Sequence, residues 1–338
     1  YDQGGAIGSN GTLTNRVVLK RGVSVISTEG PERTIIVGSS GTKDPDEYGN
    51  GTNAVRCAFL AKNSRLSGFT LTGGRTNHNG GTDDNAGSAV SGVGRDSNSV
   101  VDNCIISNNA APMGTVYKAE IFNSLVVDNV TSGQGVGVRQ GNAYNSCFAR
   151  NTGDSVLSYP RDVIGCTVAD DNIRAGGTKK STHIGNLVKD GRVFNSLFVG
   201  RLDINQKDAD YSHISNCVCA SDSTFNDHAT TGNVYLVDFS TQTFVDGVIP
   251  VAGANDAVDA ADESLATNLY SKTDLRGFQR VMNGRQDIGA YEADWRESYA
   301  AALFPNVNLL SVESASRDVA LVDGAVTIPS GKLEATWR

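Results

Sequence analysis

The sequence predicts an all-β fold, a parallel β-helix, in which the chain winds into stacked coils of short strands. One observation is a short phrase that returns along the chain, as VVDNCIISNN (100–109), IFNSLVVDN (121–129) and AYNSCFARN (143–151). Another is the composition: 38 glycines, only 7 prolines and many Val, Ile and Thr residues are typical of short strands joined by turns. Together they disfavour a protein built from long amphipathic helices.

Each copy of the phrase centres on an Asn or a Gly, and these anchors set the period. The anchors are Gly68, Asn103, Asn123, Asn145, Gly165, Asn195 and Asn216. Four of the steps between them are 20–22 residues, and the steps of 35 and 30 residues carry insertions at about 75–95 and 173–191. This period fits one coil of a β-helix, with equivalent positions stacked about 4.8 Å apart. The leucine lattice of a leucine-rich repeat is absent.

Positions counted from the anchor form columns. The positions two residues before and three residues after the anchor are apolar and predict the core, as in Val101, Ile121, Val163, Ile106, Val126 and Phe148. Asn103, Asn123 and Asn145 predict a ladder of stacked side-chain amides at a turn. Six residues further on, Asn109, Asn129 and Asn151 predict a second ladder.

Most of the six cysteines fall in the repeat. Cys104, Cys166, Cys217 and Cys219 occupy interior columns. In the column just after the anchor, cysteines alternate with serines, so we expect free buried thiols that act as small apolar residues. The Cys217-x-Cys219 pair has no second pair or His at zinc spacing.

The charge balance restricts the partners. The formal net charge is −8 and no basic cluster is evident. The sequence therefore argues against nucleic-acid binding, which depends on positive charge to neutralise phosphates. No run of about 20 apolar residues predicts a transmembrane segment. The chain begins at Tyr1 without a signal-peptide pattern, so we interpret it as a mature or excerpted segment of a longer protein.

Two stretches carry a family resemblance. VVLKRGVSVISTEGPERTIIVG (17–38) resembles the first coils of pectin-lyase-like right-handed β-helix proteins. TDLRGFQRVMNGRQDIGAYEAD (273–294) resembles the C-terminal signature of bacterial choice-of-anchor Q β-helix proteins, D-x-x-G-x-x-R followed by D-I-G-A-x-E. The resemblance implies a right-handed helix and a secreted or surface-anchored bacterial protein. It implies no single activity, because the fold hosts lyases, hydrolases, adhesins and structural parts.

These patterns predict the domain organisation. Residues 1–295 form the β-helix, and the signature at 273–294 forms a C-terminal cap over the exposed end of the solenoid. Arg280 and Arg285 are expected to fix this cap by pairing with Asp274, Asp287 or Glu292. A short helix is expected at 294–304, and residues 296–338 are a short extension or the start of a further β-domain.

A charged row is predicted on the outside of the coils. Five residues after the anchor, Asp128, Arg150 and Asp170 fall in one column. In one interpretation, opposite charges compensate each other on a solvated face. In the other, the row belongs to a groove that binds an acidic or neutral polysaccharide.

Candidates for catalysis follow from what a polysaccharide lyase needs, a cation that neutralises the substrate carboxylate and a base. Arg150 is one candidate, and Lys179, Lys180 and His183 of the second insertion are others. The remaining cations of this kind are Lys118, Arg139, Arg174 and Lys189. A glycoside hydrolase needs a carboxylate pair, and no pair stands out.

Acids and aromatic residues supply the remaining candidates. Asp83 and Asp84 of the first insertion, and Asp170 and Asp171, are candidate calcium ligands. The stretch 44–52 begins like an EF-hand loop, but Val55 stands where the final Glu is required. Sugar platforms, or partly buried side chains, are expected at Tyr117, Tyr144, Tyr159 and Tyr211.

Two functions therefore stay open. The first is an extracellular or cell-surface bacterial module that serves adhesion, assembly or glycan contact, with a polysaccharide or another surface protein as its partner. The second is a secreted polysaccharide lyase or glycoside hydrolase that acts on an acidic polysaccharide, with calcium as the candidate cofactor. Active sites of β-helices draw residues from separate coils, so a local motif does not decide between them.

Overall fold

The computed structural model describes residues 1–169, 172–175, 178–179, 191–202, 204, 212–223, 225, 229–262, 264, 272–281, 284–293, 320–322 and 325–327. The chain divides into two units, Tyr1–Ser298 and Tyr299–Arg338. The described residues of the second unit form an antiparallel hairpin of β33 (Ala320–Val322) and β34 (Ala325–Thr327). The predicted helix at 294–304 lies outside the described residues.

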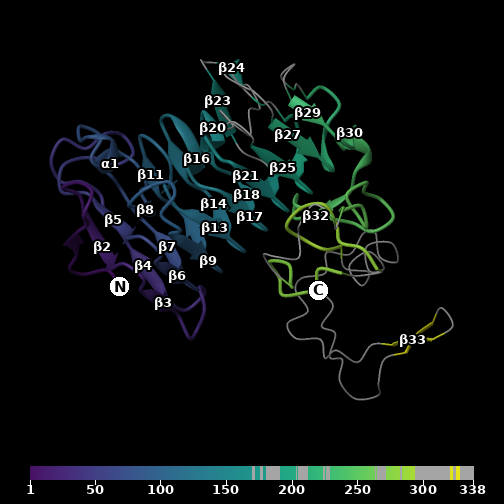
Figure 1. The fold of residues 1–338 in the computed structure, drawn as a ribbon, viewed down its shortest axis with the longest axis horizontal. Helices are drawn as coiled ribbons and strands as arrows, with labels where there is room; N and C mark the ends of the chain where they lie inside the picture. The colour runs from purple at the N-terminus through teal and green to yellow at the C-terminus, as the bar shows by residue number, and fades with distance from the viewer. Residues whose placement is uncertain are drawn as a thin grey trace, which may run out of the picture. The chain divides into compact units, whose positions relative to one another are not determined.

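The first unit is a parallel β-helix, as predicted, and three long sheets run through it (Figure 1). Sheet A contains β1 (Ala6–Ile7), β2 (Thr14–Leu19), β5 (Val55–Leu60), β8 (Val90–Gly92), β12 (Val116–Tyr117), β16 (Gln134–Arg139) and β20 (Ser155–Ser158). Sheet B contains β3 (Ser24–Ile26), β6 (Arg65–Ser67), β9 (Val100–Asp102), β13 (Glu120–Phe122), β17 (Ala143–Tyr144), β21 (Asp162–Ile164), β25 (Arg192–Phe194), β27 (Ser212–Ser215) and β29 (Ala229–Thr231). Sheet C contains β4 (Ile35–Val37), β7 (Thr70–Thr72), β10 (Ile105–Ser107), β14 (Leu125–Val127), β18 (Cys147–Ala149), β22 (Thr167–Ala169), β26 (Leu197–Val199), β28 (Cys217–Ala220) and β30 (Val234–Val237).

Smaller elements complete the coils. Sheet D contains β11 (Ala110–Ala111), β15 (Val130–Thr131), β19 (Thr152–Gly153), β23 (Asn172–Ala175) and β24 (Thr178–Lys179). The remaining elements are helix α1 (Thr82–Asn85), the 3-10 helix η1 (Phe239–Thr241) and the strands β31 (Phe244–Val245) and β32 (Ile249–Pro250). A typical coil passes through β12, β13, β14 and β15 before it returns to sheet A at β16. None of the helices in the described part of the chain is long and apolar enough to cross a lipid bilayer.

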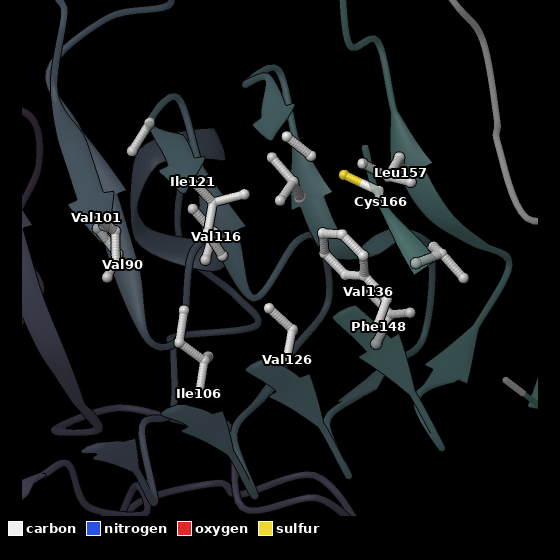
Figure 2. Close-up of a cluster of buried hydrophobic side chains, with 14 of the residues drawn as sticks. Val90, Val101, Ile106, Val116, Ile121, Val126, Val136, Phe148, Leu157 and Cys166 are labelled. Carbon is white, nitrogen blue, oxygen red and sulfur yellow. The ribbon is translucent and has the colours of Figure 1, made fainter. Parts of the chain in front are cut away.

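The core lies between the sheets and is built from the predicted columns. On sheet B, Val101 pairs in register with Ile121, and on sheet C, Ile106 pairs with Val126 and Val126 with Phe148. Figure 2 shows these side chains inside the coils, facing Val116 of sheet A. Burying one such side chain contributes about 1.5–3 kcal/mol, and every coil repeats the gain.

The turn between sheets B and C explains the Asn and Gly anchors. All seven anchors have positive φ, for example 49° at Asn103, 45° at Asn123 and 63° at Gly165. Gly and Asn adopt this left-handed conformation at the least cost. The predicted anchor ladder forms in part, because Asn145 Nδ2 donates to Asn123 Oδ1 at 2.7 Å. Asn103 departs from the prediction and donates to Asp102 instead.

The second predicted ladder is complete and fully buried. Asn109 N and Nδ2 both donate to Asn129 Oδ1 at 3.0 Å. Asn129 makes the same two bonds to Asn151 Oδ1, at 3.1 and 3.0 Å. Each Asn also donates to the carbonyl of a residue in the preceding coil, as Asn129 does to Ile106 at 2.9 Å. At the start of the ladder, Gly74 N donates to Asn109 Oδ1. Residue 74 must be a glycine, because a Cβ added to it would lie 2.0 Å from Ser88 O.

The prediction of free buried thiols is confirmed. All six cysteines are free and buried. Cys104 N donates to Ser124 Oγ, and Cys166 N to Ser196 Oγ, so serines of adjacent coils face these cysteines. Burial raises the pKa of the Cys104 and Cys166 thiols to about 12, which keeps them protonated and unreactive.

The C-terminal signature lies elsewhere than predicted. Residues 249–293 include a layer that packs against the outer face of sheet C, where Ala290 and Tyr291 contact Cys147 and Ala149. Ile288 of the same layer packs with Leu197 and Val218. The signature therefore covers the side of the coils, whereas the sequence analysis placed it over the end of the solenoid. The physical reason is that the outward positions of β14 to β28 are largely apolar and need burial.

The anchor asparagines hold this lateral layer. Asn195 Nδ2 donates to Asp262 O at 2.9 Å, and Asn216 Nδ2 to Ala260 O at 2.8 Å. Asn145 Nδ2 donates to Thr273 O at 3.3 Å, and Ala290 N donates to Thr167 Oγ1 at 2.9 Å. The column that turns the chain therefore also docks its C-terminal layer.

Buried contacts between arginines and carboxyl groups fix the layer internally. Arg280 pairs with Glu292 at 3.0 Å, as predicted. Asp274 pairs with Arg276 at 3.1 Å, a partner that the sequence analysis missed. Arg285 instead donates to Ala261 O, so its predicted carboxylate pair is not formed.

Replacing Asn129 by Ala should lower the free energy of unfolding by about 2–5 kcal/mol, because buried N–H and C=O groups in both neighbouring coils lose their partners. Urea unfolding checks this. Asn108→Gly is the matched control, since Asn108 is exposed with φ 56° and Gly keeps that backbone conformation. An equal effect of both changes would contradict the role of the ladder.

The lateral layer should make stability depend on pH. Burial raises the pKa of Asp287 to about 6 and that of Glu292 to about 8, although Arg280 opposes the shift. The folded state then holds protons that the unfolded chain releases, so the free energy of unfolding should fall as pH rises from about 5 to about 8. Glu292→Gln should flatten this dependence in urea titrations, and exposed Glu47→Gln should not. A free energy that stays constant or rises over this range in the unsubstituted chain would refute the prediction.

Candidate functional site

The outer face of sheet A gathers polar and aromatic side chains from successive coils. Ser91 pairs in register with Tyr117, Tyr117 with Arg139, and Arg139 with Ser158. These four residues form one outward row, because the preceding position in each strand faces the core. Ser91, Tyr117 and Ser158 are buried, whereas Arg139 is half-buried.

The strands of this row end in residues with unusual backbone conformations. Lys118, Gln140 and Tyr159 have φ values of 54°, 56° and 56°. They stack, since Lys118 N donates to Arg139 O and Gln140 N to Ser158 O. The left-handed conformation costs a residue of this kind about 1–2 kcal/mol. Asp128 and Arg150 adopt the same conformation at another corner, so it marks the turns of the coils.

Contacts between side chains tie the row to the first insertion. Lys118 Nζ lies 2.8 Å from Asp83 Oδ1 and 4.6 Å from the centre of the Tyr117 ring. Arg139 Nη1 donates to Gln134 Oε1 at 3.1 Å, and its guanidinium lies 5.2 Å from the Tyr159 ring centre. We call Asp83, Tyr117, Lys118, Gln134, Arg139, Ser158 and Tyr159 the sheet A site.

Burial and hydrogen bonding set the charge of Lys118. Partial burial favours the neutral amine, but contacts with Asp83 and Tyr117 outweigh it and raise the pKa of Lys118 above its ordinary value. The side chain is therefore a protonated ammonium at neutral pH.

Some polar atoms around this face lack a partner. In the described part of the chain, Arg139 Nε and Ser91 Oγ are buried without a hydrogen bond. Three further atoms share this property: Asn85 Oδ1 at the end of α1, Ser88 Oγ before β8 and Thr115 Oγ1 before β12. Buried polar groups are normally paired, so Ser91 and Arg139 depart from the usual pattern on this face.

Two members of the predicted charged row, Asp128 and Arg150, form an ion pair on a face other than that of the sheet A site. Arg150 Nε and Nη2 each donate to an Asp128 carboxylate oxygen at 2.9 Å. The pair sits at the corner after sheet C, and the side chains are 59% and 43% exposed. At such exposure the pair contributes only about 0–1 kcal/mol, in keeping with charge compensation on a solvated face. Asp170 lies outside the described residues.

The candidates of the second insertion are only partly described. Arg174 of β23 and Lys179 of β24 face each other in antiparallel register. Lys180, His183, Lys189 and Asp171 lie outside the described residues. Their proposed roles in catalysis and in calcium binding therefore stay predictions.

Asp83 and Asp84 of α1 are engaged by the protein itself. Asp84 accepts hydrogen bonds from Thr12 N, Thr12 Oγ1 and Leu13 N at 2.8–2.9 Å, and Asp83 pairs with Lys118. Within the described ranges, no cluster of three or more His, Cys, Asp or Glu side chains is arranged to hold a metal ion. The contacts of Asp84 explain its place without an ion, because they attach the N-terminal strand to the first insertion.

The aromatic candidates separate by burial. Tyr117 is 2% exposed and Tyr144 is 5% exposed, so neither ring offers a face to solvent. Tyr144 instead stacks on Phe122 with ring centres 4.6 Å apart and donates to Asp162. Tyr159 is half-buried and remains a candidate sugar platform, and Tyr211 lies outside the described residues.

Comparisons with known proteins do not decide the function. No protein-family model, no curated protein and no solved structure matches this chain. The family resemblance of 17–38 and 273–294 therefore stays a prediction, and so does the handedness that it implies.

Asp84→Asn should lower the free energy of unfolding by about 1–3 kcal/mol with calcium or with a chelator present, because the three donors lose a charged acceptor. Thermal unfolding of both proteins in each condition measures this. Asp44→Asn at an exposed loop position is the control. If the loss appears only when calcium is present, Asp84 is a metal ligand and the structural explanation fails.

Proposed function

We propose that this chain is an extracellular or cell-surface module of a bacterial protein that contacts glycans through the sheet A site. The supporting observation is the juxtaposition of Arg139, Lys118 and the half-buried Tyr159 on adjacent strands. An aromatic ring with nearby polar groups suits a sugar, whose apolar ring face packs on the aromatic face while its hydroxyls form hydrogen bonds.

The rigidity of the face supports this role. Tyr117, Gln134, Arg139 and Ser158 project from strands, and parallel pairing fixes these strands against one another. Lys118 and Tyr159 directly follow their strands, and Asp83 belongs to helix α1. A binding surface built on sheet strands keeps its geometry without ordering a loop, so little entropy is lost on binding. A module for adhesion or assembly needs such a preformed surface.

The electrostatics favour binding over elimination chemistry. A polysaccharide lyase needs a neutral base near the sugar C–H bond, and Asp83 holds Lys118 in its protonated form. Hydrolysis needs two carboxyl groups at a defined separation, and Asp83 is the one carboxylate in the sheet A site. We therefore propose contact with glycans as the function. Catalytic activity is the alternative that the experiment below also tests.

Localisation is part of the proposal. The resemblance of residues 273–294 to the choice-of-anchor Q signature supports a secreted or surface-anchored bacterial protein. The parallel β-helix supports it too, since this fold presents long, regular faces to other molecules.

The test is a glycan panel with the purified chain, in which both binding and product release are measured. Tyr159→Ala and Arg139→Ala should each weaken binding roughly tenfold, or about 1.4 kcal/mol. Arg150→Ala is the matched control, because its guanidinium is paired with Asp128 on another face. Binding that is unchanged in both site variants would refute the proposed site, and release of unsaturated or reducing sugar ends would establish the enzyme.

A further inference from the structure

Three arginines meet around Tyr159 at the corner between sheets A and B. Arg95, from the loop after β8, donates through Nη2 to Tyr159 O. Arg139 places its guanidinium 5.2 Å from the centre of the Tyr159 ring. Arg161 follows Tyr159 by two residues and is exposed. The chain as a whole carries a net charge of −8, so this local concentration of positive charge is unusual for it.

The arginines of this corner differ from outward arginines elsewhere. Arg65, Arg150 and Arg192 each form an ion pair with a carboxylate of an adjacent coil. Within the described residues, no ion pair is formed by the guanidinium groups at Arg95, Arg139 and Arg161. Their partners are neutral, as with Gln134 Oε1 and Ser158 Oγ for Arg139.

The nearby acids do not remove this positive charge. Asp83 is committed to Lys118 at 2.8 Å. Glu120 is half-buried beside Asn142, and burial raises its pKa, although the positive charge of Arg161 opposes this shift. Asp96 is exposed on the loop that carries Arg95. Burial lowers the pKa of Arg95, and the positive charge of Arg161 adds to this shift, while Asp96 opposes it. An anion bound beside the two guanidinium groups offsets their positive charge.

We propose that Arg95, Arg139 and Arg161 form an anion subsite, so that the glycan taken by the sheet A site is acidic, bearing carboxylate or sulfate groups. The inference rests on the proposed function and adds the chemical class of the ligand. A guanidinium group presents a planar fork of donors that matches a carboxylate or a sulfate ester. Arg139 Nη1 donates to the neutral groups Gln134 Oε1 and Ser158 Oγ, so its positive charge is not compensated there. Tyr159, whose ring centre lies 5.2 Å from the Arg139 guanidinium, packs against the sugar ring.

The experiment compares matched probes that differ only in charge. Oligogalacturonate is set against its fully methyl-esterified form, and dextran sulfate against dextran, in calorimetric titrations at low and at high salt. The acidic member of a pair should bind at least roughly tenfold more tightly than its neutral form, and salt should weaken this binding. The pair that shows the larger difference identifies a carboxylate or a sulfate as the preferred group.

Arg161→Gln tests the location, because Arg161 is exposed and its replacement leaves the packing intact. It should weaken the binding of the acidic probe roughly tenfold. Arg150→Gln, on the corner after sheet C, should leave binding unchanged. Unchanged binding of the acidic probe in Arg161→Gln overturns the subsite.

The outcomes separate this inference from the proposed function. Equal binding of acidic and neutral glycans overturns the anion subsite and leaves contact with glycans standing. Binding of no glycan of either kind overturns both. Preferential binding of an acidic probe that is lost in Arg161→Gln supports both.

Discussion

The buried ladder of Asn109, Asn129 and Asn151 is the interaction on which the rest of the structure depends. Asn109 and Asn129 each donate to the next coil through both the backbone N–H and the side-chain amide, and each also donates to a carbonyl of the coil before. Shifting one coil by a residue would leave these buried groups without partners, at about 1–3 kcal/mol for each group. Because the ladder occupies the end of the sheet C strands, it fixes the register of every coil that it joins.

Fixed register turns a one-dimensional repeat into a surface with defined rows. On sheet A it places Tyr117, Arg139 and Ser158 on three successive strands, although 19–22 residues separate them along the chain. Neighbouring residues of such a row are separated by one strand spacing, about 4.8 Å, which is comparable to the size of a sugar ring. The same regularity that stabilises the helix therefore presents side chains at intervals that suit a polymer.

The sequence predicted the parts of the fold that repeat. The columns through Val101, Ile121 and Phe148 identify the core, and a separate column of asparagines, six residues after the anchor, identifies the ladder. Serines facing Cys104 and Cys166 likewise indicated free thiols. These predictions succeeded because each rests on several aligned positions.

Structural features that occur only once in the chain could not be predicted from aligned repeat positions. The lateral layer is an example, although the outward positions Val127, Leu197 and Val218 carried a signal: apolar residues that face away from the core require a covering. Nothing in the sequence marks the contact between Arg95 and Tyr159, which lie 64 positions apart. Lys118 and Arg139 were among many candidate cations, and only the register shows that they share a face.

Hydrogen–deuterium exchange with and without oligogalacturonate tests the central claim most directly, since it locates the bound glycan on the coils. The claim that the sheet A site binds an acidic glycan predicts slower exchange at residues 117–118, 139–140 and 158–161. The peptides around 128 and 150 should exchange at the same rate in both samples. The claim would be contradicted if exchange slowed only in the peptides around 128 and 150, or if it changed nowhere in the chain.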